Sequence, residues 1–186
     1  MTVSKFAQQE EYDLLKELGE LLVQWFVDEL EAQGHRATGR LIESIAHIIV
    51  QRVNESLLNI EYLEYGMKLE TGVKPGDVPF GPGTSRARST DFIKQLTKWV
   101  QVKRIATQVA LAVKIAVAIA IKMSKEGIPT SGAHRFSSNG RRTGFQSFVL
   151  KSRQQEIEGR VASAAEAWVN ARIIVMVDNV NKVTMA

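Results

Sequence analysis

The sequence of 186 residues contains no cysteine, four prolines and few aromatic residues (7%). The absence of cysteine excludes disulfides, iron–sulfur clusters, thiol catalysis and cysteine-based zinc sites. Long apolar runs are also missing. The longest, residues 109–123, is interrupted by Lys114 and Lys122, whereas a membrane-spanning helix needs about 20 apolar residues. We therefore expect a buried helix there and no membrane contact. The first ten residues lack the apolar core of a signal peptide, so we expect synthesis and action in the cytoplasm.

The remaining composition is that of a globular chain, with 45% hydrophobic and 24% charged residues. This length and composition predict one domain over residues 1–186. Charge is unevenly distributed, because residues 1–34 have a net charge of −6 and residues 35–186 a net charge of +10. Residues 131–153 contain five basic residues and no acidic one. Such a segment can bind phosphate, remain solvated or bind an acidic surface on a neighbouring subunit.

Hydrophobic periodicity changes along the chain. Apolar residues three and four positions apart predict an amphipathic helix over residues 6–33, ended by Gly34. The period then becomes two, which predicts antiparallel strands at 42–50 and 57–65 with a turn at 54–56.

Gly- and Pro-rich residues 66–90 and residues 127–144 are predicted to be irregular arms. Between them we expect a helix capped by Thr90 or Asp91, and then an alanine-rich helix over 104–125, which should be the most buried helix. Residues 145–150 resemble a short strand, and residues 154–180 a final helix. The predicted class is therefore α+β, with the N-terminal and alanine-rich helices packed on a small antiparallel sheet and a C-terminal helix.

No catalytic motif is apparent. The three histidines, His35, His47 and His134, have no ligand spacing, and their side chains are expected to have packing or surface roles. Residues 81–86 read G-P-G-T-S-R, which lacks the lysine of a phosphate-binding loop. The aromatic residues do not alternate with basic ones as in a base-stacking surface. We therefore predict no enzyme activity, cofactor or metal.

The order of short motifs carries more information. Residues 38–45 read T-G-R-L-I-E-S-I, residues 62–66 Y-L-E-Y-G, and residues 92–100 F-I-K-Q-L-T-K-W-V. An Ala/Ile-rich segment ending in Gly127, Ile128 and Pro129 follows. In this order the motifs resemble the tail-completion and head–tail joining proteins of tailed bacteriophages, a family of small neck-ring subunits. The resemblance covers about residues 36–129, and a shorter match includes residues 141–145.

The resemblance implies a structural virion subunit made in the host cytoplasm, in a ring of about six or twelve copies at the head–tail junction. Its implied partners are other copies of itself, adjacent connector or head-closure proteins and tail-tube proteins, with possible non-specific contact to passing DNA. The alternative interpretation is a small nucleic-acid-binding protein that uses its basic loops. Candidates for contact with a protein neighbour or with DNA are the basic residues of the two arms: Lys74, Arg86, Arg88, Arg135, Arg141 and Arg142.

Overall fold

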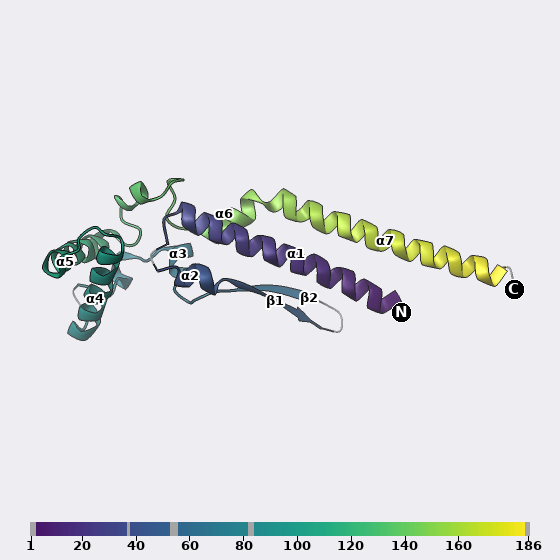
Figure 1. The fold of residues 1–186 in the computed structure, drawn as a ribbon, viewed down its shortest axis with the longest axis horizontal. Helices are drawn as coiled ribbons and strands as arrows, with labels where there is room; N and C mark the ends of the chain where they lie inside the picture. Colours follow the sequence, from purple (N-terminus) through teal and green to yellow (C-terminus); the bar gives the residue numbers. More distant parts are fainter. Residues whose placement is uncertain (1–2, 37, 53–55, 82–83, 185–186) are drawn as a thin grey trace. The chain divides into compact units, whose positions relative to one another are not determined.

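Figure 1 shows the fold in a computed structural model, which describes residues 3–36, 38–52, 56–81 and 84–184, without the side chains of residues 3–8, 168 and 171–184. The described residues form α-helices, two short 3-10 helices and a two-stranded antiparallel sheet, so the predicted α+β class is confirmed. In order they are α1 (Val3–Ala32), α2 (Arg40–Ser44), β1 (Ala46–Gln51), β2 (Ser56–Glu61), α3 (Gly66–Thr71), η1 (Pro75–Asp77), α4 (Arg86–Val102), α5 (Val109–Glu126), η2 (Ala133–Phe136), α6 (Phe145–Ser152) and α7 (Gln154–Thr184).

The chain divides into two compact units. Unit 1 comprises Met1–Trp25, Ile45–Glu61 and Phe148–Ala186, and unit 2 comprises Phe26–Ser44 and Tyr62–Ser147. The two units have net charges of −3 and +7, which together give the +4 of the whole chain. Because segments of the two units alternate along the sequence, no single linker separates them. The one domain predicted over residues 1–186 stays a prediction.

Unit 1 contains the first part of α1, the β1–β2 hairpin, the end of α6 and all of α7. The hairpin pairs Ala46 with Glu61 and Gln51 with Ser56. Helix α1 lies close to β1, because a Cβ atom added to Gly19 would be 2.6 Å from Cγ of His47. The N-terminal helix is therefore packed on the sheet, as predicted.

Helix α1 ends as its sequence predicts. Gly34 adopts the left-handed conformation with φ of 73°. The His35 amide donates to the Leu30 carbonyl and the Gly34 amide to the Glu31 carbonyl, which is the Schellman arrangement that a C-terminal glycine permits.

The first strand begins later in the chain than predicted, at Ala46 and not at residue 42. Residues 42–44 belong to α2, where the Glu43 amide donates to the carbonyl of Gly39. Leu41 and Ile45 are both buried and are four positions apart, a spacing that also fits one face of a helical turn. The second strand likewise ends at Glu61, before Tyr65. The hairpin itself is confirmed, while the turn predicted at 54–56 falls largely outside the described residues.

Unit 2 has a core of helices and connecting segments. Phe145, fully buried, has edge-on contacts with the rings of Phe26 and Tyr62 at centroid separations of 5.6 and 5.9 Å. A second cluster contains Val100, Ala106 and Ala112. Helix α5 packs on α4 and on η1. The predicted packing of this helix on the sheet would join the two units and stays a prediction.

Several boundaries in unit 2 differ from the prediction. Helix α4 begins at Arg86, because the Ser85 hydroxyl accepts a hydrogen bond from the Arg88 amide and caps the helix. Helix α5 begins at Val109 and not at 104, because Arg104 takes φ of 54° and ends α4. An arginine is not a usual residue for this left-handed position, so the break could not be predicted from the residue type.

The segment at 145–150 is helix α6 and not a strand. Phe145 and Val149 are both buried, and their separation of four residues matches a helical face. Helix α7 confirms the predicted C-terminal helix. The side chains at 168 and 171–176, including Trp168, that were expected on its apolar side lie outside the described residues. Among the described helices, none is both long and apolar enough to cross a membrane.

The two predicted arms contain regular structure. Residues 66–90 include α3, η1 and the start of α4. Val73 and Ile128 exchange backbone hydrogen bonds of 2.8 Å in both directions, so the two segments are joined to each other. Val78 is buried, with 2% of its surface exposed. The expectation that these residues are irregular and unpacked is therefore wrong for the parts that the structure describes.

Candidate functional site

A buried polar network fastens residues 137–144 to the end of α1. Oε1 of Glu29 accepts hydrogen bonds from Nε2 of Gln33 at 2.8 Å, Nδ2 of Asn139 at 2.9 Å and Nε of Arg141 at 3.2 Å. Gln33, which is fully buried, also donates to the Thr143 carbonyl at 3.2 Å. A buried carboxylate with several donors stabilises one local arrangement. Residues 137–144 are thus part of the body of unit 2.

Arg141 and Arg142 are engaged within the chain. Arg141 pairs with the buried Glu29 carboxylate, and Nη1 of Arg142 donates to the Gln33 carbonyl oxygen. Burial lowers the pKa of the Arg142 guanidinium from its usual value. Both residues were predicted to face a partner or DNA, whereas these contacts give them a structural role inside unit 2.

His35 belongs to the same region. Its Nε2 donates to the Arg142 carbonyl oxygen at 3.0 Å, which fixes the tautomer because a carbonyl can only accept. Burial, and next the positive charge of Arg142, lower the pKa of His35 to about 4. Burial and the charge of Arg142 also lower the pKa of nearby Lys103. His35 is therefore neutral at pH 7 and packs against a positively charged neighbour, in agreement with its predicted packing role.

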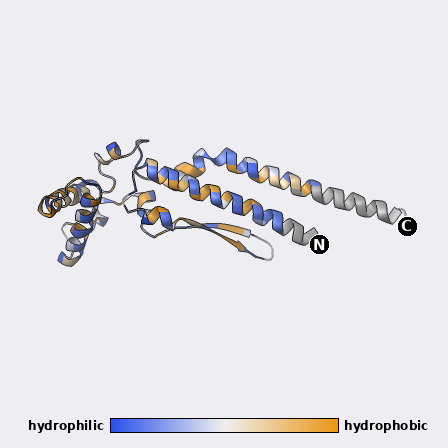
Figure 2. Cartoon of the chain, viewed as in Figure 1, coloured by the Kyte–Doolittle hydropathy of each residue, from blue (hydrophilic) through white to orange (hydrophobic). Residues whose placement is uncertain are grey.

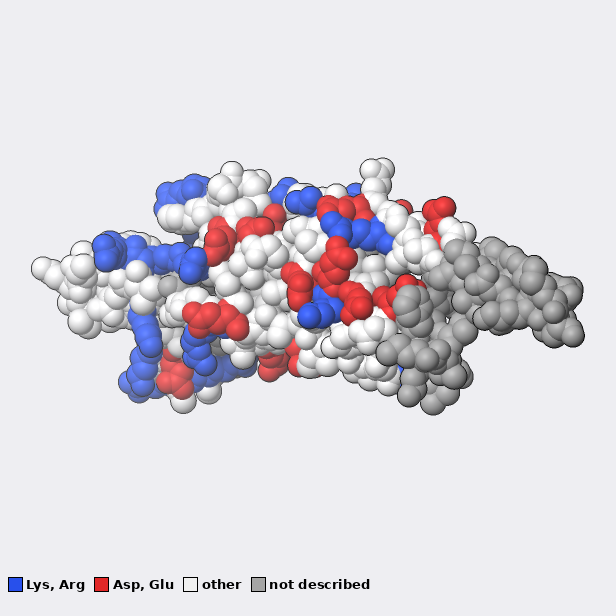
Figure 3. Space-filling model, turned by 45° about the vertical axis from the view of Figure 1, so that its right-hand side comes forward, with Lys and Arg blue, Asp and Glu red and all other residues white. Residues whose placement is uncertain are grey.

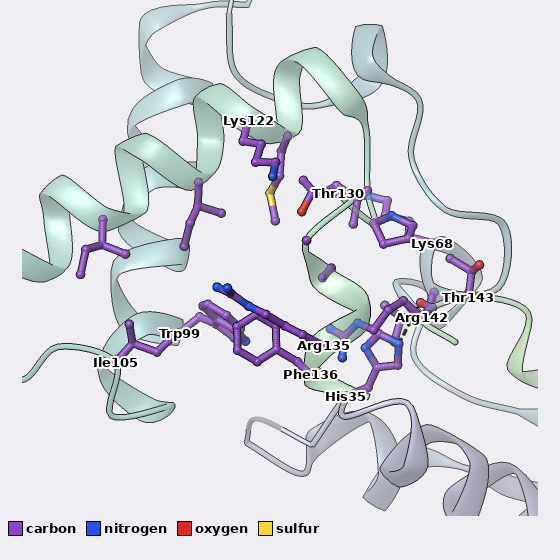
Figure 4. A pocket seen from close by; sticks show the side chains of 18 residues that line it. His35, Lys68, Trp99, Ile105, Lys122, Thr130, Arg135, Phe136, Arg142 and Thr143 are labelled. Carbon is purple, nitrogen blue, oxygen red and sulfur yellow. Dashed lines mark hydrogen bonds between the residues drawn. The ribbon is translucent and has the colours of Figure 1, made fainter. Parts of the chain in front are cut away.

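Unit 2 also contains a cavity of about 500 Å³, shown in Figure 4. One part of its wall is apolar and comes from α3, α4, α5 and the segments that follow α4 and α5. The apolar wall residues include Leu69, Trp99, Ile105, Ile115, Ile119, Met123, Ile128 and Pro129. The volume lies within the usual range for a binding pocket, about 300–1,000 Å³.

The rest of the cavity wall is basic. Four positively charged side chains line it together with the neutral His35, and the described lining includes no aspartate or glutamate. In Figure 4, Lys122 and Thr130 lie on one side of the cavity, and Trp99, Arg135 and Phe136 lie on the other. The guanidinium of Arg135 stacks over the Phe136 ring at 4.8 Å from the centroid. The four charged wall residues are Lys68, Lys122, Arg135 and Arg142.

Helix α5 carries a second apolar surface, which faces solvent. Its alanines Ala112, Ala116 and Ala120 are fully buried, and small side chains allow close helix packing. Larger aliphatic side chains on one side of the same helix are 38–65% exposed, and we call them the exposed α5 face: Val109, Val113 and Ile121. Figure 2 shows the apolar colour along α5. The prediction that this helix is the most buried is therefore wrong.

An open groove lies between α4 and α5. Its lining includes Phe80, Ile93, Val109 and Val113 together with basic side chains of α4. In Figure 3 the α4 and α5 part of unit 2 presents basic surface beside uncharged surface. The basic groove residues are Arg86, Lys94 and Lys98.

The structure places the six predicted site residues in different surroundings. Arg135 and Arg142 line the same cavity, and Arg86 lines the groove. Lys74 and Arg88 are exposed, before η1 and in the first turn of α4. The six residues do not form one patch.

Sequence reasoning missed the residues that build the network and the cavity. Glu29 and Gln33 are four positions apart, beside the apolar stripe of the helix. Polar residues at such positions usually face solvent, so their burial was not predicted. Lys68 and Lys122 looked like ordinary surface lysines. The clue for Lys122 was its position within an apolar run, which places it at the margin of a buried face.

Among the residues that the structure describes, no group of three or more His, Asp or Glu side chains is placed to hold a metal ion. Comparisons with protein-family models, with curated proteins and with solved structures found no match.

Proposed function

We propose that this chain is a structural, non-enzymatic subunit that assembles with copies of itself into a ring at the head–tail junction of a tailed phage. The motif order from residue 38 to residue 129 supports the family assignment. The structural observation that carries the proposal is the exposed α5 face, because a row of large aliphatic side chains open to water is typical of a protein–protein interface.

The energetic argument is direct. Val109 is 65% exposed and Ile121 43% exposed, so each has roughly half of its surface available for burial. Complete burial of such a side chain contributes about 1.5–3 kcal/mol, and burying the remaining half contributes about 1 kcal/mol. The three side chains of the face would together supply about 3 kcal/mol toward each subunit contact.

Charge supports association between copies. Unit 1 is acidic, with a net charge of −3, and unit 2 is basic, with a net charge of +7. Opposite charges on two separate surfaces favour head-to-tail contacts, and such contacts produce a closed ring when the rotation between neighbours closes. In this role the chain completes or joins a phage tail without chemical catalysis.

Native mass spectrometry of the purified chain over a range of concentrations tests the proposal. We expect a closed oligomer, and we expect V113D combined with I121D to shift it to monomer, because two carboxylates would be buried in the contact. Q95D is the matched control, since Gln95 is exposed on α4 and lies outside both the face and the groove. A monomer at all concentrations, or equal loss of assembly in Q95D, would contradict the proposal.

A second candidate, nucleic-acid binding, is favoured by the α4–α5 groove. Arg86, Lys94 and Lys98 line it, and none of its described lining residues is acidic. Binding through phosphates would weaken steeply as salt rises. Titration of a labelled DNA duplex against the wild-type chain and a K94E/K98E variant at two salt concentrations separates this function from self-assembly.

A further inference from the structure

The cavity of unit 2 combines features that the proposed ring contact does not use. Its apolar wall and its basic side chains belong to one partly open cavity of about 500 Å³. The exposed α5 face lies elsewhere on the same helix, since Val109, Val113 and Ile121 do not line the cavity. The two surfaces can therefore serve different partners.

The apolar wall requires an apolar occupant. Trp99, Ile115 and Ile119 are half-buried residues that pack on the Val100 cluster and leave part of their surface toward the cavity. Its volume of about 500 Å³ lies within the range of ligand pockets, about 300–1,000 Å³, which is large enough for bulky side chains such as leucine or tryptophan. Filling it would remove apolar surface from water on both partners.

The basic side chains require an acidic occupant. Lys68 and Arg135 are exposed, and Nζ of Lys122 is 3.7 Å from Oε1 of Glu126, so its charge is partly balanced. A carboxylate entering the cavity would be near several cations and no described acidic lining residue. Such complementarity speeds association and selects acidic partners.

The cavity wall is held in place before any partner binds. The Val73–Ile128 backbone pair fixes one part, and the contacts of His35 with Arg142 and of Arg142 with Gln33 fix another. A preformed site loses little conformational entropy on binding.

From these features we propose that the cavity binds an acidic peptide segment carrying bulky apolar side chains, contributed by a neighbouring virion protein. The inference rests on the proposed function for the identity of the neighbour, but the binding chemistry is independent of ring formation. DNA fits less well, because phosphates would meet the basic side chains and leave the apolar wall exposed to water.

Fluorescence anisotropy with short synthetic peptides tests the binding. The probe alternates glutamate with leucine and tryptophan; one comparison peptide replaces the apolar residues with serine, and another replaces the glutamates with lysine. We expect saturable binding of the probe, at least about tenfold weaker binding of each comparison peptide, and weaker probe binding at high salt. Equal binding of the serine peptide would overturn the proposal, and so would stronger binding of a DNA oligonucleotide that competes for the cavity.

Variants locate the site. T130W should fill the cavity and K68E/K122E should reverse its charge, each reducing probe affinity by about tenfold or more. K114E/K125E is the matched control, because both lysines are exposed on α5 or at its end and neither lines the cavity. Circular dichroism checks that each variant is folded, and a second filling variant, A133W, replaces T130W if that chain is unfolded.

The two proposals fail in different ways. If native mass spectrometry finds monomers but the peptide still binds and T130W abolishes binding, the ring is wrong and the cavity inference stands. If the ring forms but T130W and K68E/K122E bind the probe as the wild type does, the cavity inference is wrong. A peptide copied from residues 10–31 of this chain is included, and its tighter binding would reassign the occupant to a second copy and overturn the choice of a neighbouring protein.

Discussion

Glu29 is the residue on which the arrangement of residues 137–144 depends, and its removal has a calculable cost. Only 8% of its side-chain surface is exposed, and it accepts hydrogen bonds from Gln33, Asn139 and Arg141. In E29A the fully buried Gln33 amide loses its 2.8 Å partner. Leaving a buried donor without an acceptor costs about 1–3 kcal/mol.

The ion pair contributes less. The Arg141 side chain is 39% exposed, so solvent screening reduces the pair to about 1 kcal/mol. Together the two losses predict a decrease in the free energy of unfolding of about 3 kcal/mol, since the Asn139 amide is part-buried and finds water more easily. For a chain of this length, 1 kcal/mol shifts Tm by about 2–4 °C, so E29A should melt about 6–12 °C lower.

Differential scanning calorimetry measures the shift, and E31A is its matched control. Glu31 lies on the same helix and pairs with Arg36, but the two side chains are 41% and 67% exposed. An exposed pair of this kind contributes about 0–1 kcal/mol, so E31A should melt close to the wild type. Equal melting temperatures for E29A and E31A would refute the argument and would restore the mobile-arm interpretation of residues 137–144.

Two further predictions concern stability. His35 has a pKa of about 4 in the folded chain against 6.5 unfolded, so the unfolded state binds more protons between these values and stability is lost as the pH falls from 6.5 toward 4. The loss should be about 2 kcal/mol after allowance for the partial exposure of the ring. Urea unfolding at several pH values should show this component in the wild type and not in H35Q; identical profiles would contradict it. Among helix glycines, G19A should destabilise the chain, because its Cβ would be 2.6 Å from Cγ of His47, whereas G159A has no atom within 4 Å and should stabilise it by about 1 kcal/mol. If G19A and G159A both melt above the wild type, or both melt below it, this argument about packing is wrong.

The local sequence was sufficient to predict the elements in which backbone preference and hydrophobic pattern agree. Helix α1 has a long apolar period and a glycine at the position where its end requires a positive φ. Strand β1 contains three β-branched residues, and burial alternates over its first four residues and over the last four residues of β2. In these segments the backbone preference and the pattern of burial select the same structure, so the prediction needed no knowledge of distant residues.

Tertiary structure decided the remaining features. Residues 145–150 fit a period of two and a helical period almost equally, and burial of both Phe145 and Val149 favours the helix. The sequence of α5 is apolar on nearly all sides, so it could not tell which side α4 would cover.

The cavity and the Glu29 network depend most on the third dimension. Gln33 and Thr143 are 110 positions apart, yet a hydrogen bond joins them. Similarly, Lys68, Lys122 and Arg135 meet around one space because Val73 pairs with Ile128. Local periodicity indicates which face of an element is apolar. Long-range backbone pairing determines which charged side chains come together, and such pairing produces no periodic pattern in the sequence.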